Sequence, residues 1–404
     1  MKPKILRSEI DYEAALAHLD TLMDAEPGST VEEELELFAA LIENYEEELF
    51  PIELPDPVAA IEFRMEQQGL TRKDMQKYLG SQSKVSEVLS GKRPLSLTMI
   101  RKLHYELEIS AEVLLQKKDK QLPEPVYYRR DFPFAEMFKQ GFFPAFNGNL
   151  AEAKEYSEEL LAILFNSFKG QIPQAVYCKS SDRQMNENAL LAWQARVLSM
   201  VENEKLPSYD RSTLDEELQQ KLVHLSFYGT GPKLVKEHLN KKGIHFVVLP
   251  HLSKTYLDGA TFLTHSGRPV IALTLRYDRL DNFWFTLMHE LGHIYLHLND
   301  TSQAFFDETV QQHEQHSCNL LEKEANEFAF KALVPSDYWS IRIKPNIAYL
   351  SQMDVREYAD ELEIAPEILA GLMRWETKDY KKFNNMIGRN MVREQFVEYQ
   401  VSRA

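Results

Sequence analysis

Two histidines and the glutamate that follows the first of them have the spacing of a catalytic metal site. His289, Glu290 and His293 lie within the apolar stretch 283–298, which we expect to form a buried helix. Because residues four apart share one helix face, both imidazoles could bind a single zinc ion, with Glu290 as general base for a water molecule held there. This short motif also occurs by chance, so the hypothesis requires a third ligand.

The third ligand must come from another element. His297 lies one turn further along the same helix, but three ligands at this spacing extend over about 12 Å, too far for one ion. The helix predicted at 320–330 offers Glu322 beside its apolar face, with Asn326 one turn later. Glu322 as ligand and Asn326 as hydrogen-bond partner of a metal-binding histidine would explain both residues. Glu324 is the alternative ligand, and an ordinary amphipathic helix with solvated glutamates is the alternative structure.

The chain around these residues is long enough for two or three domains. It has 404 residues, 44% of them hydrophobic, and a net charge of −16. This charge argues against nucleic-acid binding by the whole surface, but it does not exclude a local basic module. There is no apolar run of membrane-spanning length and no signal-peptide core, and the cysteines are only Cys178 and Cys318. We therefore expect no membrane partner and a cytoplasmic location.

Two helices with an acidic surface are predicted in the first domain, residues 1–57. Residues 9–24 and 31–49 carry apolar side chains at helical spacing, with Asp11 as the expected N-cap of the first helix. Glutamates crowd the outer face of the second helix. This face is either ordinary solvated surface or a docking surface for a basic partner protein.

The segment 58–116 is predicted to be a helix-turn-helix DNA-binding domain. One helix begins at Thr71, at capping-box spacing from Asp74, and a second runs from about Gln82 to Ser90 after a glycine-containing turn. In a major groove, the second helix would present side chains that can read bases, and basic residues nearby would contact phosphates. The base-reading candidates are Gln82, Ser83, Lys84, Ser86 and Glu87. The phosphate-binding candidates are Lys73, Lys77, Lys92, Arg93, Arg101 and Lys102. A small helical bundle with ordinary surface lysines is the alternative.

The remaining chain is expected to contain a linker at 117–125, a mainly helical region at 126–240 and an α+β domain at 241–404. The predicted strands are 244–249, 259–264 and 270–275. The last of them could hold an extended substrate by edge pairing, and Asp281 is expected to cap the following helix. Overall, the sequence predicts an α+β fold that is mostly α.

A side chain that could stabilise an oxyanion is not singled out by the sequence. The candidates are Tyr295, His297, His313, His316 and Tyr338. The polar stretch 302–317, which contains two of them, is interpreted as a mobile lid or only a loop.

Four motifs in the N-terminal part of the chain are typical of a known family. They are Tyr12–Leu16, Pro55–Ile61, Phe63–Gln67 and Leu79–Leu95. Through them, residues 9–115 resemble antitoxins of the HigA type, a branch of the Cro/repressor helix-turn-helix proteins. The resemblance implies binding to operator DNA and a homodimer.

Further motifs surround the two histidines. They are Asp258–Ala260, Arg268–Ile271, Phe283–His293, Glu322–Ala329, Leu333–Pro335 and Tyr358–Gly371. Through them, residues 219–375 resemble the ImmA/IrrE family of zinc metallopeptidases, whose site is similar to a reduced thermolysin-like one. The resemblance implies that His289, His293 and Glu322 bind zinc and that Glu290 is the base.

The resemblance is not complete at one position. Asn326 stands where such sites often carry aspartate. The hydrogen bond to the histidine survives this change, with a weaker pull on the ring. Manganese or iron also suits two histidines and one glutamate.

Two functions follow from these patterns. In the first, a DNA-binding regulator is fused to a zinc endopeptidase that cuts a regulatory protein, either itself near 117–125 or a partner repressor, as relatives of the peptidase part do. In the second, the protein is an antitoxin-like repressor that binds operator DNA. Its residues 31–49 bind a basic toxin, and its C-terminal domain is a non-proteolytic sensor. An intact Glu290 favours the first function, because a purely structural metal site has no use for a base.

Overall fold

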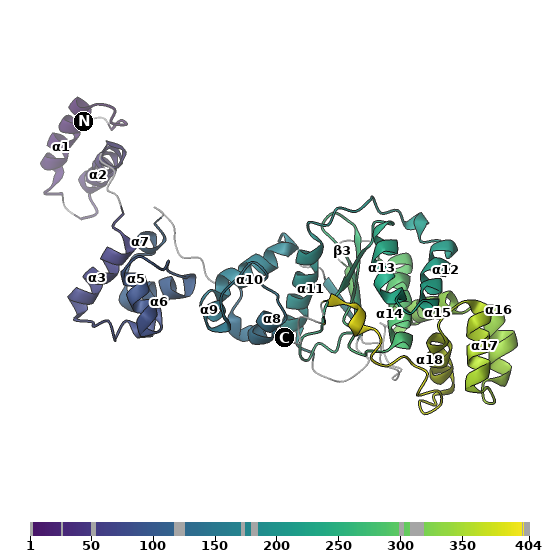
Figure 1. The fold of residues 1–404 in the computed structure, drawn as a ribbon. Coiled ribbons are helices and arrows are strands. Elements are labelled where there is room, and N and C mark those ends of the chain that lie inside the picture. Colours follow the sequence, from purple (N-terminus) through teal and green to yellow (C-terminus); the bar gives the residue numbers. More distant parts are fainter. Residues whose placement is uncertain are drawn as a thin grey trace. The chain divides into compact units, whose positions relative to one another are not determined.

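The computed structural model describes residues 3–25, 27–49, 54–116, 126–170, 174–178, 185–298, 303–307, 319–397 and 399. It divides the chain into two compact units, Met1–Glu124 and Pro125–Ala404 (Figure 1). The elements described in the first unit are all helices, and the second adds a sheet, which confirms the expected α+β, mostly α fold. The predicted linker 117–125 lies outside the described residues. Within them, no helix combines the length and the apolarity that crossing a membrane requires.

The first unit begins with α1 (Glu9–Leu22) and α2 (Thr30–Leu49), which pack together around a small core of their own. That core contains Leu6, Ala15, Leu22, Phe38, Ile42 and Tyr45. The N-cap of α1 is Ser8, whose Oγ accepts a hydrogen bond from the Asp11 backbone at 3.2 Å. The prediction that Asp11 caps this helix is therefore wrong. Asp11 lies in the first turn and accepts a hydrogen bond from Lys4 at 2.6 Å, where its charge still suits the helix N-terminus.

Five helices with a separate core complete the first unit. They are α3 (Pro57–Gln68), α4 (Gln76–Leu79), α5 (Gln82–Leu89), α6 (Leu97–Leu107) and α7 (Ala111–Leu115). Thr71 and Asp74 form the predicted reciprocal pair: the Thr71 N–H donates to Asp74 at 2.8 Å, and the Asp74 N–H donates to Thr71 at 3.4 Å. The prediction that the helix begins at Thr71 is wrong, because the pair closes a turn and α4 begins only at Gln76, with Met75 in the N-cap position. The turn between α4 and α5 contains Gly80 at φ 98°, in the left-handed region that favours glycine. The helix-turn-helix pairing of α4 and α5 thus follows the sequence pattern.

In the second unit, the described residues form one five-stranded sheet in the order β1-β5-β3-β4-β2. The strands are β1 (Gln174–Cys178), β2 (His245–Val248), β3 (Gly259–Leu263), β4 (Pro269–Leu273) and β5 (Gln303–Asp307). β3 is antiparallel to both of its neighbours, β4 and β5, whereas β1 is parallel to β5 and β2 is parallel to β4. The three predicted strands are confirmed. β1 and β5 are additional strands, and β5 lies in the stretch interpreted as a lid or loop.

The position of β4 in this order contradicts one functional expectation. β4 lies between β3 and β2, and its pairs include His245 with Val270 on one side and Thr261 with Ile271 on the other. Because both edges of β4 are used within the sheet, it cannot add an extended substrate as a further strand. The prediction that 270–275 is the substrate-binding edge is therefore wrong.

Helices cover both faces of the sheet (Figure 1). Alternate strand residues point to opposite layers, so that Ile271 and Leu273 belong to one core and Val270 and Ala272 to the other. One face packs against α8 (Phe134–Lys139), α9 (Leu150–Glu155), α10 (Ser157–Phe165) and α11 (Glu187–Val201). On the other face, one core joins the sheet to α12 (Glu216–His224), α13 (Gly231–Asn240), α14 (Leu280–Leu296), α15 (Asn319–Leu333), α17 (Gln352–Leu362) and α18 (Pro366–Thr377). Within this core, α18 packs on α14 and α17 packs on α18, with the single turn α16 (Ser336–Tyr338) nearby. Much of the region 126–240 is therefore the back layer of this sheet.

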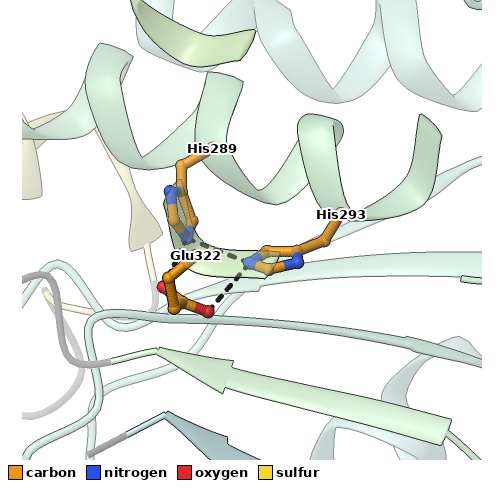
Figure 2. Close-up of side chains that lie close together, drawn as sticks. All are labelled: His289, His293 and Glu322. Atoms are coloured by element: carbon orange, nitrogen blue, oxygen red, sulfur yellow. Dashed lines mark hydrogen bonds and ion pairs between the residues drawn. The ribbon is translucent and has the colours of Figure 1, made fainter. Parts of the chain in front are cut away.

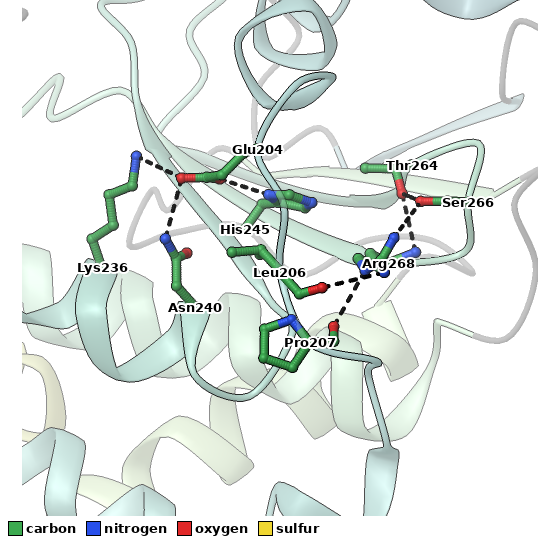
Figure 3. A network of polar contacts seen from close by, with 9 residues as sticks. All are labelled: Glu204, Leu206, Pro207, Lys236, Asn240, His245, Thr264, Ser266 and Arg268. Carbon is green, nitrogen blue, oxygen red and sulfur yellow. Dashed lines mark hydrogen bonds and ion pairs between the residues drawn. The ribbon is translucent and has the colours of Figure 1, made fainter.

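The segment between α11 and α12 is attached to the sheet by a polar network (Figure 3). The Glu204 carboxylate contacts the ring of His245 in β2 at 2.7 Å, and it accepts a hydrogen bond from Asn240 of α13 at 3.2 Å. Arg268, in the turn between β3 and β4, donates to the carbonyl oxygens of Leu206 and Pro207, each at 3.3 Å. These contacts join the back helices to the side of the sheet that carries α14.

Candidate metal centre

The helix α14 carries the two histidines and is almost completely enclosed. Thirteen of its 17 residues are buried, and the helix starts at Leu280 with Arg279 in the N-cap position. Asp281 is not the N-cap, contrary to the sequence-based expectation. It is buried in the first turn, where it accepts a hydrogen bond from Arg279 at 2.8 Å. The acidic side chain still lies at the positive end of the helix dipole.

His289, His293 and Glu322 converge on one point (Figure 2). The two Nε2 atoms are 3.1 Å apart, and each lies 3.3 Å from one oxygen of the Glu322 carboxylate. Ligand atoms of a tetrahedral zinc site with bonds of about 2.1 Å are about 3.4 Å apart. The candidate ligand atoms of the three side chains are therefore already about as far apart as the ligand atoms of one bound zinc ion. His289 and His293 are buried and Glu322 is half-buried. The donor set of two imidazoles and one carboxylate fits zinc and leaves a fourth position for water or substrate.

Contacts behind the two rings hold them in place. Nδ1 of His289 lies 3.0 Å from Oδ1 of Asn326, the partner that the sequence predicts. Since Nε2 faces the ligand position, Nδ1 carries the hydrogen and donates it to this amide oxygen. On the other side, the ring of His293 stacks on Phe305 of β5, with centroids 4.7 Å apart and planes inclined by 16°. The additional strand β5 thus forms one wall of the site.

Close packing of α15 on α14 places Glu322. Gly292 lies at the crossing, where an added Cβ would be 3.0 Å from Phe328 Cδ1 and 3.3 Å from the Cα of Ala325. Ala325 and Ala329 are fully buried in the same contact. Small residues on both helices let the backbones approach closely enough for a glutamate of α15 to reach both imidazoles.

Glu290 is directed into the sheet by a residue that the sequence reading missed. Its carboxylate is fully buried, and its Oε2 accepts a hydrogen bond of 2.8 Å from the Thr261 hydroxyl of β3. Thr261 is itself fully buried. The only sequence signal is strand alternation, which places Thr261 on the same face of β3 as Gly259.

Gly259 leaves the space that Glu290 occupies. A Cβ at this position would lie 2.1 Å from Glu290 Oε1, so Gly259→Ala must displace the carboxylate. We expect this substitution to lower the rate of the peptide hydrolysis that the sequence predicts by about 100-fold, because a displacement of about 1 Å of a catalytic group is enough for such a loss. Metal content should not change, since the three ligands remain. Turnover and metal content of the variant measure both effects.

Gly229→Ala is the matched control for this substitution. An added Cβ at Gly229 meets no atom within 4 Å, and Gly229 does not require a left-handed conformation. Its activity should equal that of the wild type. Full activity of Gly259→Ala would show that Glu290 does not need its observed position.

The other sequence-derived candidates lie as follows. Glu324 contacts Nε2 of His297 at 2.9 Å, and Nδ1 of His297 lies 3.0 Å from Nδ1 of His293. The structure therefore brings Glu322, rather than Glu324, to His289 and His293. Burial lowers the pKa of His297, although its hydrogen bond with Glu324 acts in the opposite direction.

Of the remaining oxyanion candidates, Tyr295 packs on Phe328 with ring centroids 5.6 Å apart, and the Tyr338 hydroxyl donates to Glu361 at 2.6 Å. Tyr295 therefore packs on α15, and Tyr338 is bonded to a residue of α17. His313 and His316 lie outside the described residues, as does Cys318.

The predicted DNA-contacting residues lie on and after α5. Gln82, Ser83, Ser86 and Lys92 are exposed, whereas Lys84, Glu87 and Arg93 are half-buried. Arg93 donates to Glu87 at 2.8 Å and Ser83 donates to it at 3.1 Å. The hydrogen bond from Arg93 lowers the pKa of Glu87. Three of the predicted DNA contacts, Ser83, Glu87 and Arg93, therefore bond to one another in the free protein.

Comparison with known proteins identifies both parts of the chain. Residues 239–370 match the model of a peptidase family, described as the IrrE N-terminal-like domain. Among curated proteins, the chain is 33% identical over 118 residues to Antitoxin HigA of Escherichia coli (strain K12) and, to the same extent, to Antitoxin HigA of Shigella flexneri. These matches cover 27% of this chain and 83% of each relative. The chain belongs to the HigA antitoxin family through its N-terminal region and carries a metallopeptidase-type IrrE N-terminal-like domain in its C-terminal part.

Proposed function

We propose that this protein is a DNA-binding transcriptional regulator whose C-terminal domain is a zinc-dependent endopeptidase. The observation that carries the proposal is the position of Glu290. Its carboxylate is buried and held by Thr261, and it follows directly after one histidine of a cluster with metal-ligand spacing. A structural metal site gains nothing from such a carboxylate, whereas hydrolysis requires a base at this place.

His289, His293 and Glu322 would hold the ion. Zinc bound there would lower the pKa of a water molecule toward about 7 and polarise the scissile carbonyl group. Glu290 accepts the proton of that water on its carboxylate and passes it to the leaving amine. Thr261 orients the carboxylate by its hydrogen bond, and the helix α15 closes one side of the site.

The N-terminal unit supports the regulatory part of the proposal. The helix α5 follows α4 after a short turn and exposes polar side chains, as the recognition helix of a helix-turn-helix does. The HigA relatives are antitoxins by name. We propose operator DNA as the ligand of α5, a homodimer as the binding form, and a helix-turn-helix repressor or the chain's own segment 117–125 as the peptidase substrate.

Cleavage assays test the peptidase. Zinc-loaded protein is incubated alone and with purified helix-turn-helix repressors, and the fragments are identified by mass spectrometry. We expect fragments that disappear on chelation and return when zinc is added. Intact chains in every combination would contradict the proposal, as would fragments that chelation leaves unchanged.

DNA binding has a separate prediction. Lys92→Ala should weaken binding to all sequences and reduce the salt slope by about 1, because Lys92 would contact only phosphate. Gln82→Ala should cost about 1–3 kcal/mol on the selected operator and relax the preference at one base pair. Titrations at several salt concentrations, on DNA selected from a random pool, measure both. Equal behaviour of the two variants would contradict the assignment of separate roles.

The helix α2 favours a second candidate function, that of an antitoxin-like repressor with a toxin partner. Its exposed or half-buried acidic side chains are Glu32, Glu33, Glu34, Glu36, Glu43 and Glu46. Glu34 contacts His18 and Glu46 accepts a hydrogen bond from Tyr12, both in α1, whereas the exposed members of this set include Glu33, Glu36 and Glu43. These exposed carboxylates could hold a small basic protein. Co-purification of such a protein, together with tight operator binding and no zinc, would favour a non-proteolytic sensor over the peptidase.

A further inference from the structure

His297 connects a ligand histidine to a carboxylate on another helix. It is the C-cap residue of α14 and is only 8% exposed. One ring nitrogen, Nδ1, lies 3.0 Å from Nδ1 of His293, and the other, Nε2, lies 2.9 Å from Oε2 of Glu324. Both nitrogens of a buried ring are therefore engaged, one towards the metal centre and one towards α15.

With neutral imidazoles, only one placement of hydrogens satisfies these contacts if His293 is a ligand. Nε2 of His293 faces the ligand position and must offer a lone pair there, so its Nδ1 carries the hydrogen. Nδ1 of His297 then accepts this hydrogen bond, and Nε2 of His297 carries the hydrogen that it donates to the Glu324 carboxylate. The direction of the whole chain of hydrogen bonds is thereby set from the metal centre outward.

We propose that His297 and Glu324 form a positioning relay that orients His293 and strengthens its binding to the metal. The inference rests on the proposed function, since it assumes that His293 binds a metal ion. The relay gives His293 an indirect carboxylate partner, as Asn326 is the direct partner of His289. α15 thus supplies one ligand, Glu322, and the anchors of both ligand histidines.

The position of Glu324 suits an indirect role. Glu322 and Asn326 are one turn apart, and each contacts His289 or His293 directly. Glu324 is two residues from each, so its side chain points to a different side of the helix. It contacts His297, the outer histidine of the hydrogen-bonded series, at 2.9 Å. Its side chain is 46% exposed, so we expect a smaller effect from Glu324 than from the buried His297.

The test is zinc affinity, measured on the full chain by competition with a chromophoric chelator. His297→Leu removes the acceptor for His293 and should weaken zinc binding by about 10–100-fold. His297→Asn keeps an acceptor near the position of Nδ1 and should recover most of the affinity. Glu324→Gln should fall between His297→Leu and the wild type. Glu327→Gln is the matched control, because Glu327 is exposed on the same helix and pairs only weakly with Lys331 at 3.9 Å.

Thermal unfolding without zinc separates positioning from packing. Recovery of affinity in His297→Asn, with apo stabilities of His297→Asn and His297→Leu alike, would support the relay. Tight zinc binding by the wild type with unchanged affinity in His297→Leu and Glu324→Gln would overturn the relay and leave the proposed function intact. A wild type that binds no zinc would overturn the metal centre and the relay together.

Discussion

Replacing Glu290 by glutamine is expected to abolish peptide hydrolysis and to leave zinc binding unchanged. An amide cannot accept the proton of water at neutral pH, and loss of general base catalysis lowers rates by about 10²–10⁴-fold. The amide oxygen can still accept the hydrogen bond from Thr261, so the local structure should be retained. Single-turnover cleavage rates and metal analysis of the same preparations measure the two quantities.

Glu327→Gln controls for the loss of a negative charge near the site, since it makes the same chemical change at an exposed position of α15. Its cleavage rate should equal that of the wild type. If Glu290→Gln cleaves at an unchanged rate, Glu290 is not the base. If instead it loses zinc, the carboxylate belongs to the metal-binding set, and the assignment of three ligands is wrong.

Replacing Glu322 by alanine is expected to remove both zinc and activity. The carboxylate lies 3.3 Å from each ligand histidine, and two imidazoles alone make a weak and mobile site. Affinity should fall by more than the roughly 10–100-fold typical of residues behind the ligands. Zinc at 1,000 times its Kd stabilises the folded wild type by about 4 kcal/mol, and this gain should be absent from the variant.

The contrast between Glu322 and Glu324 is the sharpest check of this assignment. Glu324→Ala should retain zinc with reduced affinity, because its carboxylate contacts His297 rather than the ligand position. Thermal unfolding with and without zinc, together with metal analysis, distinguishes the two variants. A larger loss of affinity in Glu324→Ala than in Glu322→Ala would reverse their roles. His289→Ala should behave as Glu322→Ala does, since either change leaves only two ligands.

Several parts of the fold could be predicted because their signals are local. The positions of α5 and of the strands β2, β3 and β4 follow from side-chain periodicity within a few residues. The Thr71–Asp74 pair follows from capping chemistry over three residues.

Other parts could not be predicted because they depend on contacts distant in sequence. β5 pairs with β1, which lies more than 120 residues earlier in the sequence, as in Ala175 with Ala304. No local sequence pattern near β5 predicts this pairing. The same order of strands encloses β4, which the sequence placed at an edge. The capping residue of a helix also depends on which groups compete for its side chain. The Asp281 carboxylate accepts a hydrogen bond from Arg279 and does not cap α14.

For the candidate site, the sequence by itself determined which helix carries the two candidate metal ligands and the candidate base. The spacing of His289, Glu290 and His293 is a property of one helix, and helical periodicity places the two imidazoles side by side without any other element. The sequence also pointed to the helix that follows, but it offered two glutamates on different sides of that helix, Glu322 and Glu324, as the third ligand.

Only the tertiary structure decided between those two glutamates and gave Glu290 its setting. The crossing of α14 and α15 at Gly292 sets the rotation of one helix against the other, and that rotation brings Glu322 to both histidines. The sheet places Thr261 and Gly259 against the Glu290 carboxylate. These are distances between separate elements, set by how their side chains pack, and no spacing within a single element contains them.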